Sequence, residues 1–339
     1  MDTTSIAFCA MGVELHAFNV RDDELPFFDE MIKDEHLDLT LSANDLTMEM
    51  IPTLDPGSGV CIQGMRTYEY AMFHALAERG VHFLTTRTIG YNNLDLNAAR
   101  SCGVHVANVN YPPNGVADYT VMMILLCPRN YKQALWRTNC NDYSLEGLMG
   151  RDMKDLTIGI IGTGKIGAQV ARNLSGFGCR LIAYDRHPKE ELKNIVTYVD
   201  LDTLYAKSDV ITVHTALTKD TYHLISLRTL EKMKDGVVLI NCARGALMDV
   251  EALIRGIETQ KIGALGIDCI ENEENIVHRN RKTDIFPNRQ MAYLRQFKNV
   301  VHTQHMAFYT EDAIRSMVYE GIHGLLAMEE GKELKTQLC

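Results

Sequence analysis

Short apolar runs alternate with amphipathic stretches along most of the chain. Continuous apolar runs bounded by turn residues are typical of strands that are buried on both faces of a parallel sheet. Helical periodicity lies between several of these runs, most clearly at Lys165–Phe177 and Val250–Glu258. Alternating strands and helices predict an α/β fold with parallel sheets and right-handed crossovers. The expected strands are Gly59–Ile62, Val81–Thr85, Thr157–Ile161, Arg180–Tyr184, Val210–His214, Val237–Asn241, Ala264–Ile267 and Val300–Thr303.

A cluster of helix- and strand-breaking residues divides the chain into two parts. The segment Asn110–Gly115 contains two consecutive prolines and is followed by the amphipathic run Val116–Leu126. We interpret it as a linker that leads into a long helix. A second segment, Asn275–Phe297, is polar, weakly patterned and contains a basic cluster, which predicts a solvated surface excursion.

Composition narrows the class of protein. A length of 339 residues suggests two domains. The chain has 34 Lys and Arg against 44 Asp and Glu, and the resulting net charge of −10 argues against a nucleic-acid partner. The apolar run Val121–Cys127 is too short to span a bilayer, and the first residues lack the basic region of a secretory signal. Nine cysteines without a C-x-x-C pair favour free thiols, so we expect a cytoplasmic protein with no membrane partner.

The strongest local signal is a glycine-rich turn, G-x-G-x-x-G, at Gly162, Gly164 and Gly167. It follows an expected strand and opens an expected helix, which is the context that dinucleotide binding requires. The first glycine permits a tight turn, the second lets a pyrophosphate approach the backbone, and the third lets the helix pack on the strand. The next strand ends at Asp185, where a carboxylate accepts hydrogen bonds from ribose hydroxyls and repels a 2′-phosphate. NAD is therefore favoured over NADP.

Two alternative interpretations of this turn remain. Gly159 to Lys165 also has the G-x-x-x-x-G-K spacing of a phosphate-binding P-loop. Ile166 then stands where such a loop needs a Ser or Thr to bind magnesium, which disfavours a nucleotide triphosphatase. A glycine turn with a purely structural role is the other alternative, and the strand, the helix and Asp185 together favour the dinucleotide site.

Polar residues follow three more of the expected strands, at the sheet edge where α/β proteins bind ligands. Arg244 comes directly after one strand, and its guanidinium could bind a planar carboxylate in a bidentate manner. The segment Asp268–Glu274 holds several carboxylates, one of which could orient a histidine. Taken singly, Arg244 could equally form a surface salt bridge, and the acidic segment could equally be a solvated loop.

A histidine in the third of these segments is a natural acid–base group near neutral pH. His302 and His305 are spaced as H-x-x-H, but no third residue at metal-ligand spacing lies nearby. We therefore expect no metal site here.

Together these residues resemble the D-isomer-specific 2-hydroxyacid dehydrogenase family, closest to its D-lactate dehydrogenase branch. The glycine turn with Asp185 matches the cofactor fingerprint of the family, and four further motifs agree in order and spacing. They are Thr86–Asp95, similar to S-R-x-x-G-x-x-N-I-D; Asn241–Asp249, similar to N-x-x-R-G-x-x-V-D with Met248 in place of valine; Asp268 with Glu273, similar to D-x-x-x-x-E; and His305–Thr310, similar to H-x-A-[FY]-[FY]-T.

The resemblance implies an architecture of two Rossmann-like, flavodoxin-like domains. A substrate domain would comprise residues 1–110, completed by residues 306–339. An NAD-binding domain, a doubly wound parallel sheet, would comprise residues 111–305. The family implies a homodimer formed through this coenzyme domain.

The resemblance also implies roles for single residues. Arg244 would bind the carboxylate and the carbonyl of a 2-keto acid. His305 would protonate the carbonyl oxygen, and Glu273 would hydrogen-bond the imidazole and keep it charged. Further substrate contacts would come from the backbone at Gly64 and Met65 and from Tyr309. Contacts with NAD would come from Gly162, Gly164, Lys165, Ile166, Gly167, Asp185, Thr215, Ala216, Thr221, Cys242, Ala243 and Asp268, the last meeting the nicotinamide carboxamide.

The implied activity is the NADH-dependent reduction of a 2-keto acid to its (R)-2-hydroxy acid, with pyruvate and D-lactate as the first expectation. Aromatic or branched keto acids such as phenylpyruvate and 2-ketoisocaproate are the alternative, because Met65 and Met306 make the pocket edge adaptable. An alternative from another class is an NADH-sensing, corepressor-like binding protein.

Overall fold

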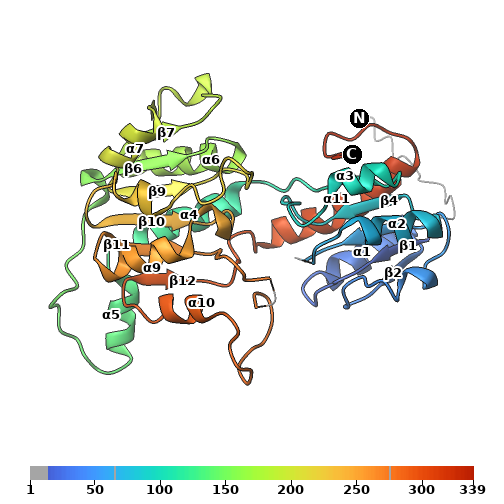
Figure 1. Ribbon diagram of the computed structural model, residues 1–339, viewed down its shortest axis with the longest axis horizontal. Helices are drawn as coiled ribbons and strands as arrows, with labels where there is room; N and C mark the ends of the chain where they lie inside the picture. Colours follow the sequence, from blue (N-terminus) through green and yellow to red (C-terminus); the bar gives the residue numbers. More distant parts are fainter. Residues whose placement is uncertain (1–13, 65, 275) are drawn as a thin grey trace. The chain divides into compact units, whose positions relative to one another are not determined.

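Two compact units make up the chain (Figure 1). The computed structural model describes residues 14–64, 66–274 and 276–339, so the expected site residue Met65 lies outside the described residues. The first unit contains residues 1–112 and 310–339, and the second contains residues 113–309. The chain therefore leaves the first unit, builds the whole of the second, and returns.

The first unit is built on a five-stranded sheet whose pairs are all parallel. Its strand order is β2-β1-β3-β4-β5, which is the order of flavodoxin-like doubly wound sheets. The strands are β1 (Leu15–Ala17), β2 (Leu39–Leu41), β3 (Gly59–Ile62), β4 (Phe83–Thr86) and β5 (His105–Ala107).

Helices flank this sheet. Helix α3 (Leu96–Ser101) is capped by Asp95, whose carboxylate accepts hydrogen bonds from the backbone N–H groups of Asn97 and Ala98. The returning helix α11 packs against β3 and β4, and at Gly321 a Cβ would lie 2.9 Å from Cγ of Arg87. Only glycine permits this approach. The helices are α1 (Leu25–Glu35), α2 (Tyr70–Arg79), α3 (Leu96–Ser101) and α11 (Glu311–Glu329), with a 3₁₀ turn η1 (Ile51–Thr53).

The second unit is built on a seven-stranded parallel sheet of order β12-β11-β10-β9-β6-β7-β8. The order reverses between β6 and β9, which makes this edge the switch point where doubly wound sheets bind dinucleotides. The strands are β6 (Thr157–Ile161), β7 (Arg180–Tyr184), β8 (Thr197–Tyr198), β9 (Val210–Val213), β10 (Val237–Asn241), β11 (Ile262–Ile267) and β12 (Val300–His302).

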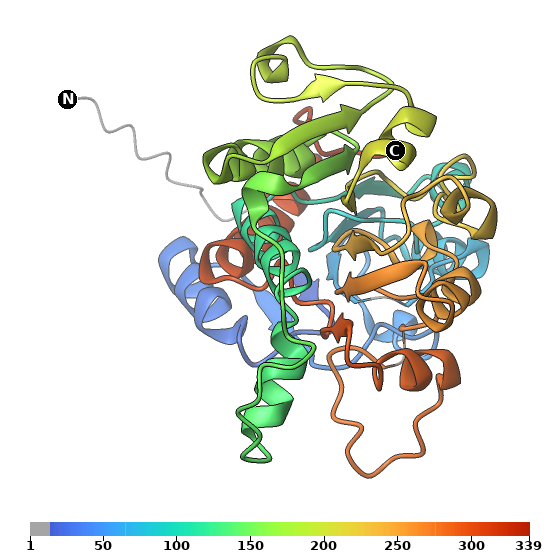
Figure 2. The same cartoon turned by 90° about the vertical axis from the view of Figure 1, so that its left-hand side faces the viewer.

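Helices pack on both faces of this sheet, and α5 projects from the body of the unit in both views (Figures 1 and 2). The α-helices are α4 (Asn114–Leu126), α5 (Tyr131–Thr138), α6 (Lys165–Leu174), α7 (Leu201–Lys207), α8 (Leu227–Leu230), α9 (Val250–Glu258) and α10 (Arg289–Leu294). The 3₁₀ turns are η2 (Met153–Asp155), η3 (Ser175–Phe177), η4 (Glu190–Leu192) and η5 (Gly245–Leu247).

The predicted strands are all present, with small shifts at their ends. The strand expected at Val81–Thr85 runs over Phe83–Thr86, and the one expected at Ala264–Ile267 begins two residues earlier, at Ile262. The helix expected at Lys165–Phe177 ends at Leu174 and continues as a 3₁₀ turn. Val, Ile and Leu side chains from these strands, such as Ile211, Leu239 and Leu265, form much of the core of the second unit.

The interpretation of residues 275–297 as a solvated excursion is wrong in part. This segment contains α10, and Met291 and Leu294 of that helix belong to the apolar core of the second unit. Ile276 and Val277 of the same segment are also buried. The pattern is misleading because the apolar residues occur in short groups, such as 276–277 and 291–294, that polar stretches separate. Among the residues that the structure describes, no helix combines the length and apolarity needed to cross a membrane.

Candidate active site

A histidine and a glutamate form a close pair at the carboxyl end of the second sheet. His305 follows β12, and its Nδ1 atom lies 2.7 Å from Oε1 of Glu273, which follows β11. Glu273 is buried, and its second oxygen accepts a hydrogen bond from the backbone N–H of Ile270 at 2.9 Å. Because an ionised carboxylate only accepts, Nδ1 of His305 carries a proton. Nε2 is then the ring nitrogen that can exchange a proton with a ligand.

Asp268 fixes the backbone around this histidine. Its side chain is fully buried, and one oxygen accepts hydrogen bonds from Oγ1 of Thr303 (2.6 Å) and the N–H of Met306 (2.9 Å). The other oxygen accepts from the N–H of Ala307 at 2.7 Å. The carboxylate therefore holds the chain on both sides of His305. Its expected contact with the nicotinamide stays a prediction.

Arg244 lies on a turn directly after β10. The side chain of Asn241 closes this turn by donating to the carbonyl of Arg244 (2.9 Å) and accepting from the N–H of Ala243 (3.0 Å). At Gly245 a Cβ would lie 2.2 Å from the backbone of Ile270, so only glycine lets the two loops approach this closely. The turn that carries Arg244 is thus packed against the loop that leads to Glu273.

Two buried cysteines lie beside this turn. Cys242 is the expected cofactor contact, and Cys269 donates its thiol hydrogen to the carbonyl of Ala243 at 3.5 Å. Burial raises the pKa of both thiols, so both are protonated and uncharged near neutral pH.

The glycine turn has the shape of a pyrophosphate cradle. Gly162 has a φ of +92°, and a Cβ there would lie 2.7 Å from the carbonyl oxygen of His214. At Gly167 a Cβ would lie 1.9 Å from the carbonyl oxygen of Gly162, whereas at Gly164 it would meet no atom of the described residues within 4 Å. The first and third glycines therefore serve packing within the protein. The second keeps an open surface at the start of α6, where a dinucleotide phosphate would lie.

Asp185 lies at the end of β7 and holds the same turn. Its Oδ2 accepts hydrogen bonds from the N–H (2.6 Å) and Oγ1 (3.0 Å) of Thr163, and its Oδ1 accepts from the N–H of His187 (2.8 Å). Burial raises the pKa of Asp185, but these hydrogen bonds outweigh it and hold the pKa below its ordinary value. The residue is therefore a carboxylate at neutral pH, as an NAD-selective site requires.

The remaining expected cofactor residues gather at the same sheet edge. Thr215 and Ala216 follow β9, and Thr221 donates to the carbonyl of Ala216 at 2.7 Å. Oγ1 of Thr215 is buried and has no hydrogen-bond partner within the described part of the chain. Such an orphaned hydroxyl fits a site that a bound cofactor completes. Lys165 and Ile166 open α6 beside the glycine turn.

The expected substrate contacts are divided between the two units. Gly64 follows β3 of the first unit and has a φ of +94°, and a Cβ there would lie 2.7 Å from Nδ2 of Asn19. Tyr309 is the last residue of the second unit, and 47% of its surface is exposed.

Two groups of side chains have the composition of metal ligands. One consists of Cys269, Glu273 and His305, and the other of His223, Asp249 and Glu271, with ligand atoms within 4.8 Å of one another in each group. In both groups a histidine–glutamate hydrogen bond of 2.7 or 2.8 Å already accounts for the closeness. His302 of the H-x-x-H pair belongs to neither group.

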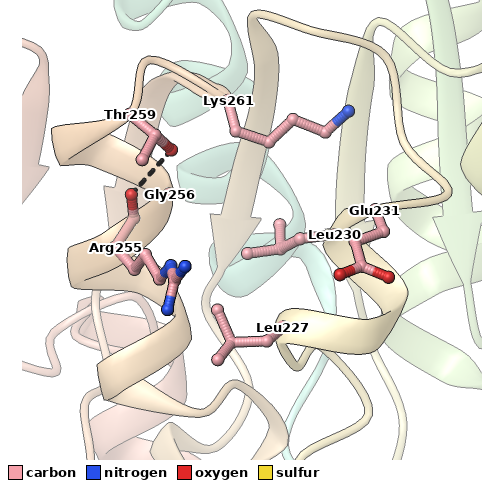
Figure 3. Close-up of a pocket in the computed structure, with 7 residues that line it drawn as sticks. All are labelled: Leu227, Leu230, Glu231, Arg255, Gly256, Thr259 and Lys261. Carbon is pink, nitrogen blue, oxygen red and sulfur yellow. Dashed lines mark hydrogen bonds between the residues drawn. The ribbon is translucent and has the colours of Figure 1, made fainter.

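A pocket of about 440 Å³ lies between α8 and α9 (Figure 3). It is lined by Leu230 and Arg255, and by Lys261, which precedes β11. The residues described above follow the carboxyl ends of the strands, so this pocket lies at the opposite end of the sheet. It is not part of the site.

One residue of the site could not be identified from sequence patterns. His278 lies in the segment interpreted as a surface excursion, and its Nε2 atom lies 3.0 Å from the backbone carbonyl oxygen of His305. Its ring meets those of His305 and Phe308 edge to face, with centroids 6.2 and 5.9 Å apart. No motif contains this residue, and only the fold brings it to His305.

Comparison with known proteins agrees with this geometry. The model of the family described as "D-isomer specific 2-hydroxyacid dehydrogenase, NAD binding domain" matches residues 121–307. The chain is 38% identical over 308 residues to an aromatic 2-oxoacid reductase of Clostridium sporogenes, covering 90% of this chain and 93% of the relative. It is 37% identical over 295 residues to the D-lactate dehydrogenase of Escherichia coli, covering 86% and 90% of the two chains.

A solved structure shows the same likeness over both units. The D-isomer specific 2-hydroxyacid dehydrogenase of Lactobacillus delbrueckii subsp. bulgaricus, in its NAD-complexed form, superposes with a TM-score of 0.82 at 29% identity. The match covers 96% of this chain and all of that chain. The chain therefore belongs to the D-isomer specific 2-hydroxyacid dehydrogenase family, in its D-lactate dehydrogenase branch, and is an NAD-dependent oxidoreductase.

Proposed function

We propose that the enzyme reduces pyruvate to D-lactate, with His305 as the general acid, Glu273 as its partner and Arg244 as the carboxylate-binding residue. The observation that carries this proposal is the 2.7 Å hydrogen bond between His305 and the buried Glu273. A carbonyl becomes an alcohol only if its oxygen receives a proton as its carbon receives a hydride. A charged imidazole at the carboxyl end of the sheet is suited to give that proton.

Each of these residues has a separate role in the reduction of the keto acid. When bound, NADH supplies the hydride. Glu273 stabilises the positive charge on His305 before transfer, and Nε2 of His305 gives its proton to the keto oxygen. Arg244 offers a planar fork of donors to the carboxylate and carbonyl of the substrate. In the reverse direction the neutral imidazole takes the hydroxyl proton.

The two units have separate roles in this proposal. The second unit would be the NAD-binding domain, and the glycine turn, Asp185 and Thr215 would hold the cofactor. The first unit would be the substrate domain, with backbone N–H groups at Gly64 and Met65 on the carboxylate. Tyr309 would add a further contact.

An aromatic keto acid is a second candidate substrate. Edge-to-face contacts link four rings in a row. The ring of His278 meets those of His305 and Phe308, and Phe308 meets Tyr309 with centroids 6.1 Å apart. Such a cluster favours a flat, apolar side chain such as that of phenylpyruvate. The relative from Clostridium sporogenes, whose name includes aromatic 2-oxoacids, points the same way.

The test is NADH oxidation with pyruvate, 2-ketoisocaproate, phenylpyruvate and oxaloacetate, compared by kcat/KM in wild type and His305→Gln. We expect pyruvate to be the best substrate and the variant to lose turnover while still binding NADH. A higher kcat/KM for phenylpyruvate would replace pyruvate by an aromatic substrate. NADH binding without turnover on any of the four acids would contradict the proposal and favour a sensing protein.

A homodimer in the cytoplasm completes the proposal. The arm around α5 carries apolar side chains that are at least half exposed, an unusual density for a surface without a partner. They are Tyr131, Leu135, Trp136, Tyr143, Leu145 and Met149. A second copy of the chain would cover them. The cysteines that the structure describes are all free, which fits a reducing compartment.

A further inference from the structure

We infer that His278 is a positioning residue for His305, holding the backbone of the general acid while Glu273 holds its ring. The inference rests on the proposed role of His305 and deepens it. His278 was absent from every sequence motif. It contacts His305 from a loop that hydrogen bonds and buried apolar side chains hold in place.

Glu273 and His278 lie on the same loop, and both contact His305. The carbonyl of Glu273 accepts hydrogen bonds from the N–H groups of Ile276 (2.8 Å) and Val277 (3.1 Å), and both of these side chains are buried. Asn288, at the start of α10, closes the base of the loop by donating to the carbonyl of Glu271 at 3.0 Å. The apolar anchors therefore fix the position of His278 although that residue itself is exposed.

The contact of His278 with His305 has a defined direction. A carbonyl oxygen only accepts, so Nε2 of His278 must carry a proton and donate it. Within the described residues, no backbone N–H donates to the carbonyl oxygen of His305. His278 thus supplies a hydrogen bond that the local backbone does not.

His305 needs this support because of its conformation. Its φ is +56°, in the left-handed region that residues other than glycine seldom adopt. Asp268 fixes the N–H groups of Met306 and Ala307, and His278 fixes the carbonyl that precedes Met306. Together they hold the peptide plane after His305. The Cα atom from which the imidazole side chain extends is therefore fixed in position. Proton transfer depends on such placement, since an error of about 1 Å can cost about a hundredfold in rate.

Three variants of the full-length enzyme test the inference. His278→Phe keeps a ring against Phe308 but removes the donor. His278→Gln places an amide N–H the same number of bonds from Cα and restores a donor. His82→Phe is the matched control, because the exposed His82 of the first unit also bonds a backbone carbonyl, that of Gly103, at 3.1 Å.

We expect His278→Phe to lower kcat by roughly tenfold to a hundredfold, with the KM for pyruvate and the Kd for NADH near their wild-type values. The solvent deuterium isotope effect on kcat should rise, because the proton donor is misplaced. His278→Gln should recover most of kcat, and His82→Phe should match wild type.

Other outcomes would overturn the inference. These are an unchanged kcat in His278→Phe, a loss that His278→Gln fails to restore, or a change confined to KM. A variant that no longer folds would also contradict it, because a positioning residue leaves the fold intact. Undiminished turnover in His305→Gln would instead overturn the proposed function itself.

Discussion

Both oxygens of Glu273 are used, one by Nδ1 of His305 at 2.7 Å and the other by the backbone N–H of Ile270 at 2.9 Å. The carboxylate is buried, so its charge is not screened by water. The arrangement orients the imidazole and makes a positive charge on it favourable. The two contacts call for two accepting oxygens, which a carboxylate has and an amide of the same shape lacks.

The first prediction follows from this geometry. In Glu273→Gln the amide can accept only one of the two hydrogen bonds and must turn a donor toward either His305 or Ile270. We expect kcat to fall by roughly a hundredfold, and the free energy of unfolding to fall by about 1–3 kcal/mol. Steady-state kinetics and thermal unfolding measure both effects. An unchanged kcat would remove Glu273 from the mechanism.

Arg244 provides the second prediction. Lysine keeps the positive charge but lacks the planar fork that binds a carboxylate and a carbonyl together. We expect Arg244→Lys to raise the KM for the keto acid and lower kcat, reducing kcat/KM by about a hundredfold or more. The Kd for NADH is the control and should stay the same. Equal kcat/KM in the two enzymes would show that Arg244 does not hold the substrate.

Two of the three glycines of the cofactor turn give a third prediction, because their surroundings differ. At Gly167 a Cβ would meet the carbonyl oxygen of Gly162 at 1.9 Å, whereas at Gly164 the described part of the chain leaves 4 Å of open space around it. Gly167→Ala should therefore destabilise the fold, by about 1–3 kcal/mol or more. Gly164→Ala should fold normally but raise the Kd for NADH about tenfold, because its methyl group occupies the approach of the pyrophosphate. Tm and fluorescence titration with NADH separate the two effects, and equal behaviour of the variants would contradict this account.

The alternation of apolar runs was sufficient to predict the buried strands β6, β10 and β11, because each is dominated by apolar residues and small glycines and is bounded by turn residues. The strands β1, β2, β5 and β8 are only two or three residues long, too short to establish a period. The return of α11 to the first unit came from the resemblance alone. Long-range packing decides such a contact, and local pattern does not encode it.

Only some residues of the site were predictable from the sequence, as with the strands. Gly162 and Asp185 stand directly after β6 and β7, and Arg244 and His305 lie in the loops that follow β10 and β12. Their place at one sheet edge therefore follows from the parallel topology. His278 stands far from any strand end in a polar segment. Its approach to His305 depends on the burial of Ile276 and Val277, two apolar residues among charged neighbours.

The fourth prediction concerns assembly. Leu145 and Met149 are 83% and 92% exposed on the arm that follows α5, and a second copy of the chain would bury them. Leu145→Asp should shift the protein toward monomers, because a charge would be desolvated in the interface. Sedimentation velocity measures the shift. Ile285→Asp is the matched control, since Ile285 is 97% exposed on a loop of the same unit, and it should leave the dimer intact. A monomeric wild type would contradict the proposed dimer.

The last prediction concerns pH and rests on His214 and His302, whose pKa values burial lowers to about 4. The unfolded chain binds a proton at each of these residues below about pH 6.5, and the folded chain does so only near pH 4. Their contribution to stability is therefore complete above pH 6.5 and is lost as the pH falls from 6.5 to 4. His302 is the better residue to change, because its Nε2 is buried and no residue that the structure describes gives it a hydrogen bond. Between pH 6.5 and pH 4 we expect the Tm of His302→Leu to fall by roughly 5 °C less than the Tm of the wild type. Scanning calorimetry from pH 7.5 to 4 gives the comparison, and parallel curves for the two proteins would show that His302 is protonated equally in both states.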